Sequence, residues 1–582
     1  MFEVKDNFYL NGEPFQIVSG AFHYFRTVPE YWRDRLEKLK NMGCNTVETY
    51  IPWNFHEIHK GEFLWDGMHD ICRFIEVANE LGLYMIVRPS PYICSEWEFG
   101  GLPAWLLKDR NMRLRCSYAP YLEAVKDYYK VLMPKLVPYQ IDRGGNIILM
   151  QIENEYGYYG NDTSYLEFLR DTMRELGITV PFVTSDGPWS ESGFKSGCVE
   201  GALPTGNFGS NVESQFVAMQ KYMGADKPLM CMEFWCGWFD AWGDKEHHVS
   251  NLEQNKKDLD ALMRLGHVNF YMFHGGTSFG FMSGRNSGNL TSDVTSYDYD
   301  GMLTEDGRIT PKYRAFKEII ERYKEVPQIP LTTQIKRKSY GKIDCSGKTD
   351  LFSVLEKIAN PIHTSYPLTM EEVNQNFGYI LYRTEMKVSE EATEIQLEGA
   401  ADRVQGFLNR RHAFTAFGEN IGEKFDIPFK EKGTVIDLLC ENFSRENFGT
   451  GIDYQRKGIS GAVKINDRRH FGYDIYALPF DEEQVARINF ESGYTKGLPA
   501  FYKFDFEVDE CCDTFLDFAG FAKGCAFING FNLGRFWEVG PQRRLYVPAP
   551  LLKQGSNTVI IFETEGKAAD SIYLCDESQL IP

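Results

Sequence analysis

The N-terminal half of the chain, to about residue 325, alternates between short apolar segments and segments with helical periodicity. Continuous apolar runs bounded by turn residues are typical of strands buried on both faces. In the segments between them, apolar residues recur every three or four positions, as Trp32, Leu36 and Leu39 do. The predicted strands are 17–22, 44–50, 83–89, the apolar part of 144–157, 182–185, 200–203 (the weakest), 228–234 and 268–273, and helices are predicted at 31–40, 70–81, 118–136, 165–176 and 252–265.

Eight strands interleaved with helices predict an α/β domain, with a (β/α)8 (TIM) barrel as the best fit to the available length. Such a barrel needs roughly 250 residues plus insertions. A doubly wound open sheet is the alternative. The first predicted strand is not followed by Gly-x-Gly-x-x-Gly, which counts against a dinucleotide-binding sheet.

The pattern changes after about residue 326, where Pro327–Pro330 indicates a linker. Helical periodicity then becomes rare, and short alternating runs such as 502–508 dominate. Runs of this kind at short spacing predict two all-β sandwich domains of roughly 100 residues each. The predicted division is a barrel at 1–325, a linker with the first β-strands at 326–375, and β-sandwiches at 376–490 and 491–582.

Composition narrows the function classes. The 582 residues carry 62 basic and 82 acidic side chains, a net charge of -20, so neither nucleic acid nor an anionic membrane is an expected partner. No apolar run is long enough to span a membrane. The start of the chain lacks the pattern of a secretory signal, and the 13 cysteines show no Cys-x-x-Cys spacing. We therefore expect a cytoplasmic protein with free thiols and no zinc site.

Polar and aromatic side chains gather where the predicted strands end. In a barrel of this kind those ends open onto one rim, which carries the active site. Carboxylates and amides can bind hydroxyl groups, and aromatic rings can cover the apolar face of a sugar. We therefore expect a polyhydroxylated substrate at a rim built from the segments that follow these strands, namely 48–57, 88–98, 154–155, 233–238, 274–276 and 297–300.

Glu155 and Glu233, at the ends of the fourth and seventh predicted strands, form a pair suited to glycoside hydrolysis. That reaction needs one protonated carboxyl group to assist the leaving group and one ionised carboxylate as nucleophile or base. Burial or a neighbouring negative charge supplies the first. Arg88 is expected to pair with an active-site carboxylate and to favour its ionised form. Glu48, Glu98 and Glu153 are interpreted mainly as structural.

Several of these segments resemble the β-galactosidases of glycoside hydrolase family 35. The resemblance covers most of residues 15–315, and its motifs are specific when taken together. Ser90 and Ser95 depart from the commonest family residues, and the short chain resembles the compact bacterial type. The matching segments are 43–54, 88–102, 144–156, 233–238, 275–279 and 297–300, with 381–384 and 527–535 resembling the β-domains of the family.

The resemblance implies a retaining exo-β-galactosidase with jelly-roll, galactose-binding-like β-domains. Glu155 would be the acid/base and Glu233 the nucleophile, while Asn154 would bind the sugar 2-hydroxyl. Tyr50, Cys94, Ser95 and Glu96 would line the galactose pocket, Tyr299 would lie beside the nucleophile, and Trp235 and Trp238 would lie at the rim. The implied substrate is a galactose-terminated oligosaccharide, with a β-1,3 linkage as one candidate. No metal or cofactor is implied, and a homodimer is compatible.

Three alternatives remain at this stage. A related barrel exo-glycosidase could select another sugar, with the difference lying around Tyr50, Ser95 and Glu96. A non-catalytic carbohydrate-binding protein would not need both glutamates, and an adhesive surface protein would bind through its β-domains. It is also open whether Trp235, Trp238 or Tyr454 forms a subsite for the group released with the sugar (the aglycone).

Overall fold

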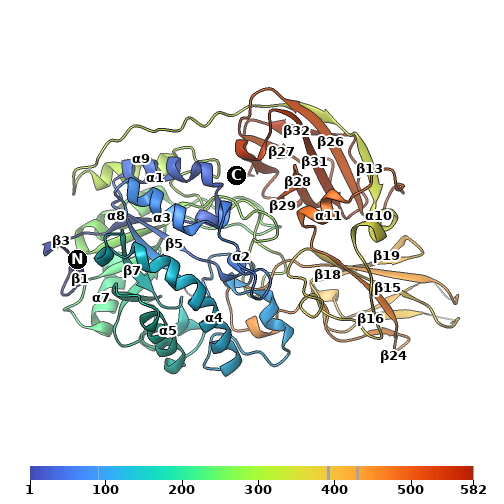
Figure 1. Ribbon diagram of the computed structural model, residues 1–582, viewed down its shortest axis with the longest axis horizontal. Helices are drawn as coiled ribbons and strands as arrows, with labels where there is room; N and C mark the ends of the chain where they lie inside the picture. Colours follow the sequence, from blue (N-terminus) through green and yellow to red (C-terminus); the bar gives the residue numbers. More distant parts are fainter. Residues whose placement is uncertain (90, 390–392, 428–430, 581–582) are drawn as a thin grey trace.

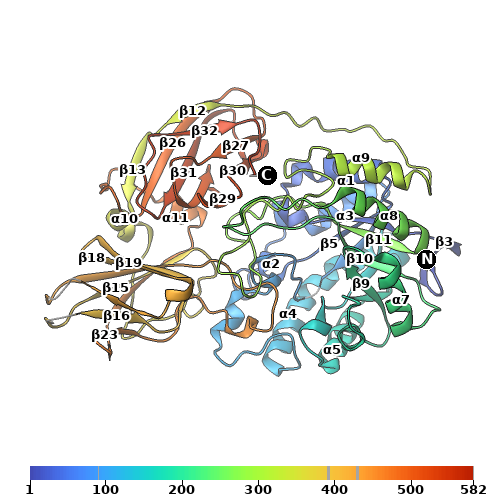
Figure 2. The same ribbon diagram turned by 180° about the vertical axis from the view of Figure 1, so that it is seen from behind.

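The computed structural model describes residues 1–89, 91–389, 393–427 and 431–580. Its N-terminal half is a barrel, and two all-β domains lie together against one side of it (Figures 1 and 2). The predicted fold class is thereby confirmed. Ser90, one of the two departures noted above, lies outside the described residues.

Eight parallel strands close the barrel in the order β10-β11-β4-β5-β6-β7-β8-β9. Their side chains are almost entirely buried, as expected when helices cover the outside and side chains fill the inside. The weakly predicted sixth strand, 200–203, is longer than expected and runs to Phe208. The strands are β4 Val18–Phe22, β5 Thr46–Tyr50, β6 Tyr84–Arg88, β7 Ile147–Gln151, β8 Phe182–Asp186, β9 Ala202–Phe208, β10 Met230–Trp235 and β11 His267–His274.

A small antiparallel sheet of β1 (Phe2–Val4), β2 (Phe8–Leu10) and β3 (Glu13–Pro14) packs against the barrel. Phe2 and Phe8 belong to the same apolar cluster as Ile86, Ile148 and Met232 of the barrel strands. The cluster fills one end of the barrel interior, and polar site residues gather beyond the carboxyl ends of the strands.

The five predicted barrel helices are present, each with ends within two residues of the prediction. Gly43 ends the first of them with φ 111°, a conformation that glycine adopts without strain. Helices α2, α6, α7 and α9 were not predicted, and α2 and α6 are only four and six residues long. The helices are α1 Trp32–Met42, α2 Trp53–His56, α3 Ile71–Glu80, α4 Ala119–Leu136, α5 Thr163–Glu175, α6 Glu191–Ser196, α7 Val212–Met223, α8 Leu252–Leu265 and α9 Pro311–Ile320.

The first all-β domain pairs a six-stranded sheet, β14-β25-β15-β21-β18-β19, with a four-stranded one, β20-β16-β23-β24. Ile380, Val404 and Leu438 contribute to the apolar core of this domain. The strands are β14 Ile362–Thr364, β15 Tyr379–Glu385, β16 Glu394–Leu397, β17 Ala400–Ala401, β18 Arg403–Leu408, β19 Arg411–Phe417, β20 Lys424–Asp426, β21 Val435–Glu441, β22 Gly458–Ile459, β23 Val463–Ile465, β24 Arg468–Arg469 and β25 Tyr473–Leu478.

The second all-β domain stacks the sheets β12-β32-β27-β30 and β13-β26-β31-β28-β29. Its first two strands come from the segment after the barrel, because β12 pairs with β32 and β13 with β26. The bounds are β12 Gly341–Asp344, β13 Gly347–Asp350, α10 Leu351–Ile358, α11 Glu482–Ala486, β26 Ala500–Val508, β27 Thr514–Asp517, β28 Lys523–Ile528, β29 Phe531–Trp537, β30 Arg544–Val547, β31 Gly555–Glu563 and β32 Ser571–Cys575.

The three parts share buried contacts. Phe281 of the barrel lies in one apolar cluster with Tyr379 of the first all-β domain and Phe501 of the second. Arg445 of the first all-β domain forms a fully buried ion pair with Glu98 of the barrel. Across the described residues, no helix combines the length and the apolar character that a membrane span requires.

Candidate active site

Glu155 and Glu233 line one cavity of about 340 Å³ at the rim of the barrel. Glu233 lies within β10, and Glu155 follows the end of β7. Strands β8 and β9 separate these two strands in the barrel order. The two carboxyl groups therefore reach the same space from different parts of the rim.

Glu233 is held by three hydrogen-bond donors. The Tyr50 hydroxyl and Arg88 Nη2 both donate to its Oε1, each at 2.7 Å, and Trp235 Nε1 donates to its Oε2 at 3.1 Å. Arg88 is fully buried and also lies 3.7 Å from the Glu48 carboxylate. A buried guanidinium and two further donors suit an ionised carboxylate, as expected for the partner of Arg88.

Glu155 has different surroundings. Burial, followed by the negative charge of Glu233, raises the pKa of Glu155 to about 8. Asn207 Nδ2 donates to Glu155 Oε1 at 3.1 Å, and this bond opposes the rise. Glu155 is therefore mostly protonated at neutral pH, which is the state required of a general acid.

The backbone around Glu155 is unusual. Glu153 and Glu155 both have positive φ, 56° and 48°, a region that side chains other than glycine rarely occupy and that is concentrated at functional sites. Arg115 holds Glu153 by two hydrogen bonds, at 2.9 and 2.8 Å, and also donates to the Asn154 carbonyl. Glu153 thus has a structural contact that fixes the turn carrying Asn154 and Glu155, consistent with its interpretation from the sequence.

The residues predicted for the sugar pocket lie together. Cys94, Ser95, Glu96, Asn154 and Tyr299 all line the cavity. The first three are consecutive and have φ of 56°, 58° and 46°, so that a left-handed turn after β6 presents them to the cavity.

Tyr50 does not line the cavity, since its ring is fully buried beneath it. Its hydroxyl lies 3.0 Å from Asn154 Oδ1, which also accepts a hydrogen bond from Arg88 Nη2 at 2.7 Å. These contacts fix the amide of Asn154 with its oxygen toward the barrel interior. Tyr50 therefore acts on Glu233 and Asn154, in contrast to its predicted place in the pocket wall.

The mouth of the cavity is aromatic. Trp235 and Trp238, which were predicted to lie at the rim, both line the cavity, and their ring centroids lie 5.8 Å apart. Trp189, 52% exposed, packs on Trp235 at 5.7 Å. Phe448, 40% exposed, reaches the same cavity from the first all-β domain. Tyr454 is 71% exposed and is not part of the lining.

Comparison with known proteins identifies the family. The sequence model of "Glycosyl hydrolases family 35" matches residues 7–323. The chain belongs to glycosyl hydrolase family 35. Models described as "Beta-galactosidase, first all-beta domain" and "Beta-galactosidase, galactose-binding domain" match residues 367–479 and 499–557.

Curated relatives align over nearly the whole chain. "Beta-galactosidase-1-like protein 2" of Homo sapiens is 40% identical over 96% of this chain and 88% of its own length. "Beta-galactosidase" of Homo sapiens is 37% identical over 99% and 89%, and "Beta-galactosidase 17" of Arabidopsis thaliana is 36% identical over 97% and 87%. The chain is therefore a glycoside hydrolase.

Several residues that line the cavity of this family 35 hydrolase were not predicted from the sequence. Trp189 follows β8 and could have been found by the rule that strand ends carry the site. Asn286 and Phe448 lie on loops distant in sequence, and their backbones form a β-bridge with each other. The residues missed are Tyr158, Trp189, Phe239, Tyr271, Asn286 and Phe448.

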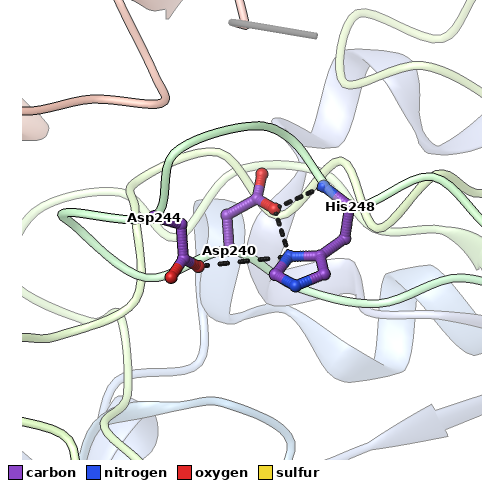
Figure 3. A group of neighbouring side chains, drawn as sticks. All are labelled: Asp240, Asp244 and His248. Carbon is purple, nitrogen blue, oxygen red and sulfur yellow. Dashed lines mark hydrogen bonds and ion pairs between the residues drawn. The ribbon is translucent and has the colours of Figure 1, made fainter.

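One group of side chains within the described part of the chain has the spacing of metal ligands, namely Asp240, Asp244 and His248 (Figure 3). Asp240 Oδ1 already accepts hydrogen bonds from the backbone N–H of His248 at 2.9 Å and from its Nδ1 at 2.8 Å. None of the three lines the cavity. A hydrogen-bonded cluster accounts for this arrangement, and the expectation that the enzyme needs no metal stays a prediction.

Proposed function

We propose that this family 35 hydrolase is a retaining exo-β-galactosidase that releases terminal non-reducing β-D-galactose through a covalent galactosyl-enzyme. The observation that carries the proposal is the contrast between Glu233, which accepts three hydrogen bonds, and Glu155, whose pKa is raised to about 8, in one cavity. This contrast supplies one nucleophile and one acid. The name "Beta-galactosidase" of the Homo sapiens relative supports galactose as the sugar.

In the first step, a Glu233 carboxylate oxygen forms a bond to the anomeric carbon while the glycosidic C–O bond breaks. Glu155 transfers its proton to the departing oxygen, so the aglycone leaves as a neutral alcohol. The Asn154 amide nitrogen is available for the sugar 2-hydroxyl, because the contacts of the amide oxygen with Arg88 and Tyr50 fix the orientation of the group. Such a contact strengthens in the transition state.

In the second step, water attacks the anomeric carbon, Glu155 takes the proton from that water, and the bond to Glu233 breaks. Forming the ester has removed the negative charge of Glu233, which is one of the causes of the high pKa of Glu155. The pKa of Glu155 therefore falls in the intermediate, and the same residue becomes a carboxylate that can act as base.

The aromatic mouth supports an aglycone subsite next to the galactose pocket. Trp189, Trp238 and Phe448 expose ring surface at the mouth, and exposed rings can stack on the apolar face of a second sugar. Trp235 has a different role, because its indole N–H donates a hydrogen bond to Glu233. We therefore assign the aglycone subsite to Trp189, Trp238 and Phe448, and Tyr454 is not part of it. The linkage preference, with β-1,3 as one candidate, would be set here.

Steady-state hydrolysis of a panel of aryl glycosides tests the proposal. Wild type should prefer the β-galactoside over the β-glucoside, the α-arabinoside and the β-glucosaminide. Glu233→Gln should lose about 10⁴-fold or more of kcat, as removal of a nucleophile does elsewhere. Preference for another sugar would refute galactose specificity while leaving the two-carboxylate mechanism in place.

Glu305→Gln is the matched control. Glu305 is a buried barrel carboxyl outside the cavity lining, and burial raises its pKa to about 8. The amide therefore resembles the protonated group already present, and activity should be retained. Full activity in Glu233→Gln would contradict the assignment of the nucleophile.

A further inference from the structure

Asn207 is a buried polar residue placed between the two glutamates. It lies on β9, and its Cα pairs in register with that of Glu233 on β10. Its side chain is fully buried and does not line the cavity. The neighbouring residue on the strand, Gly206, faces Met219 of α7, so Asn207 points into the barrel, as alternation along a strand requires.

The hydrogen bonds of Asn207 have a defined direction. Its Nδ2 donates to Glu155 Oε1 at 3.1 Å, and its Oδ1 accepts from the Ser185 hydroxyl on β8. The Ser185 carbonyl in turn accepts the backbone N–H of Glu155 at 2.9 Å. Two adjacent strands therefore hold both the backbone and one carboxyl oxygen of Glu155.

We propose that Asn207 is a positioning residue for acid catalysis, which decides the oxygen of Glu155 that carries the proton. An amide N–H can only donate, so Oε1 must act as an acceptor toward Asn207. The proton of the neutral carboxyl then resides on Oε2, which has no hydrogen bond with any residue in the described part of the chain. The O–H group of Glu155 is thus available to a substrate in the cavity.

The alternative orientation shows why the arrangement matters. If the amide oxygen of Asn207 faced Glu155, the protonated carboxyl could donate to it and the proton would be directed away from the substrate. In this structure the Ser185 hydroxyl donates to the amide oxygen, so that the amide nitrogen faces Glu155. Asn207 also donates to the carboxylate formed after proton transfer, which stabilises that product of the step.

The inference rests on the proposed function, because it assigns a role relative to Glu155 as the acid. Acid assistance matters most when the leaving group is a weak acid, and it contributes typically 10²–10⁴-fold. The experiment therefore compares kcat/KM for phenyl β-galactoside, whose phenol has a pKa near 10, with that for dinitrophenyl β-galactoside, whose leaving group needs no proton.

Asn207→Ala should lower kcat/KM for the phenyl galactoside by at least about tenfold and change that for the dinitrophenyl galactoside by less than about twofold. The alkaline limb of the pH profile should move to higher pH, because the lost donor had stabilised the charged carboxyl. Asn207→Leu, which keeps the branching at Cγ but removes the donor, should behave in the same way. Thr205→Ala is the control, since Thr205 is buried on the same strand but donates to the Thr184 carbonyl, 2.7 Å away.

An equal loss on both substrates, an unchanged ratio, or failure of both Asn207 variants to fold would assign Asn207 to the framework of the barrel and overturn the proposal. Glu155→Gln separates this failure from that of the proposed function. If Glu155→Gln selectively loses the phenyl galactoside while Asn207→Ala does not, only the role of Asn207 is wrong. If Glu155→Gln shows no selectivity, the acid itself is wrongly assigned.

Discussion

The buried ion pair between Arg445 and Glu98 should hold the first all-β domain against the barrel. Arg445 Nη1 lies 2.7 Å from Glu98 Oε1, and Arg445 Nε lies 3.1 Å from Glu371 Oε1. All three side chains are fully buried. Arg445→Met would leave two carboxylates in the interior without their cation, and breaking a buried pair in this way costs about 3–5 kcal/mol.

The same loop reaches the active site, so the change should also affect catalysis. Phe448 lines the cavity three positions beyond Arg445, and its carbonyl accepts the N–H of Ser287 at 3.0 Å. We expect Arg445→Met to reduce kcat/KM on a galactosyl disaccharide more than on β-galactosyl fluoride, whose leaving group cannot reach Phe448. Urea unfolding followed by tryptophan fluorescence measures the free energy of unfolding. Steady-state kinetics measures kcat/KM on the two substrates.

Arg110→Met is the matched control, because Arg110 joins the same two domains through Glu372 at 2.9 Å but is 53% exposed. An exposed pair contributes about 0–1 kcal/mol. Adding Glu98→Gln to Arg445→Met should recover part of the lost stability, since it removes one uncompensated charge. The reasoning would be refuted if Arg445→Met were no less stable than Arg110→Met.

Three further predictions concern the site. Since the pKa of Glu155 is raised to about 8, kcat/KM should fall as pH rises through about 8 and the acid loses its proton; a profile flat to pH 10 would contradict this. Tyr50→Phe keeps the ring over Arg88 but removes a donor to Glu233, and kcat/KM should drop by about 10- to 150-fold, from the roughly 1.5–3 kcal/mol of a hydrogen bond to a charged group; unchanged kinetics would count against a role for that hydroxyl. Phe448→Ala should weaken kcat/KM on a disaccharide by about 2- to 12-fold, from roughly 0.5–1.5 kcal/mol of aromatic contact, and leave β-galactosyl fluoride unaffected; equal effects would argue against an aglycone subsite.

The barrel and the two glutamates could be predicted because their signals are local. The segment 147–152, apolar except for Gln151, leads into Glu153-Asn154-Glu155, and strand ends in such a barrel converge on one rim. Asn207 was missed because its strand, Ala202-Leu-Pro-Thr-Gly-Asn-Phe208, contains Pro, Gly and Asn, which are all depleted in strands. The strand predicted at 200–203 stops short of Asn207, and only the closure of the barrel shows that it continues to Phe208.

Local sequence patterns could not predict which residues distant segments add to the cavity and to the second all-β domain. Phe448 enters the cavity because Arg445 and Asn447 attach its loop to the barrel, whereas the equally aromatic Tyr454 remains exposed. Strands β12 and β13 join the second all-β domain by pairing with β32 and β26, whose residues lie at least 150 positions away in the sequence. Periodicity describes each strand but not its partner.

The stereochemistry of the first product tests the central claim most directly. Proton NMR during hydrolysis of an aryl β-galactoside identifies the anomer of galactose that forms before mutarotation. Double displacement through a galactosyl ester of Glu233 predicts β-galactose first, with α-galactose following as the solution equilibrates. α-Galactose as the first product would contradict the account, because Glu233 would then activate water instead of forming the bond.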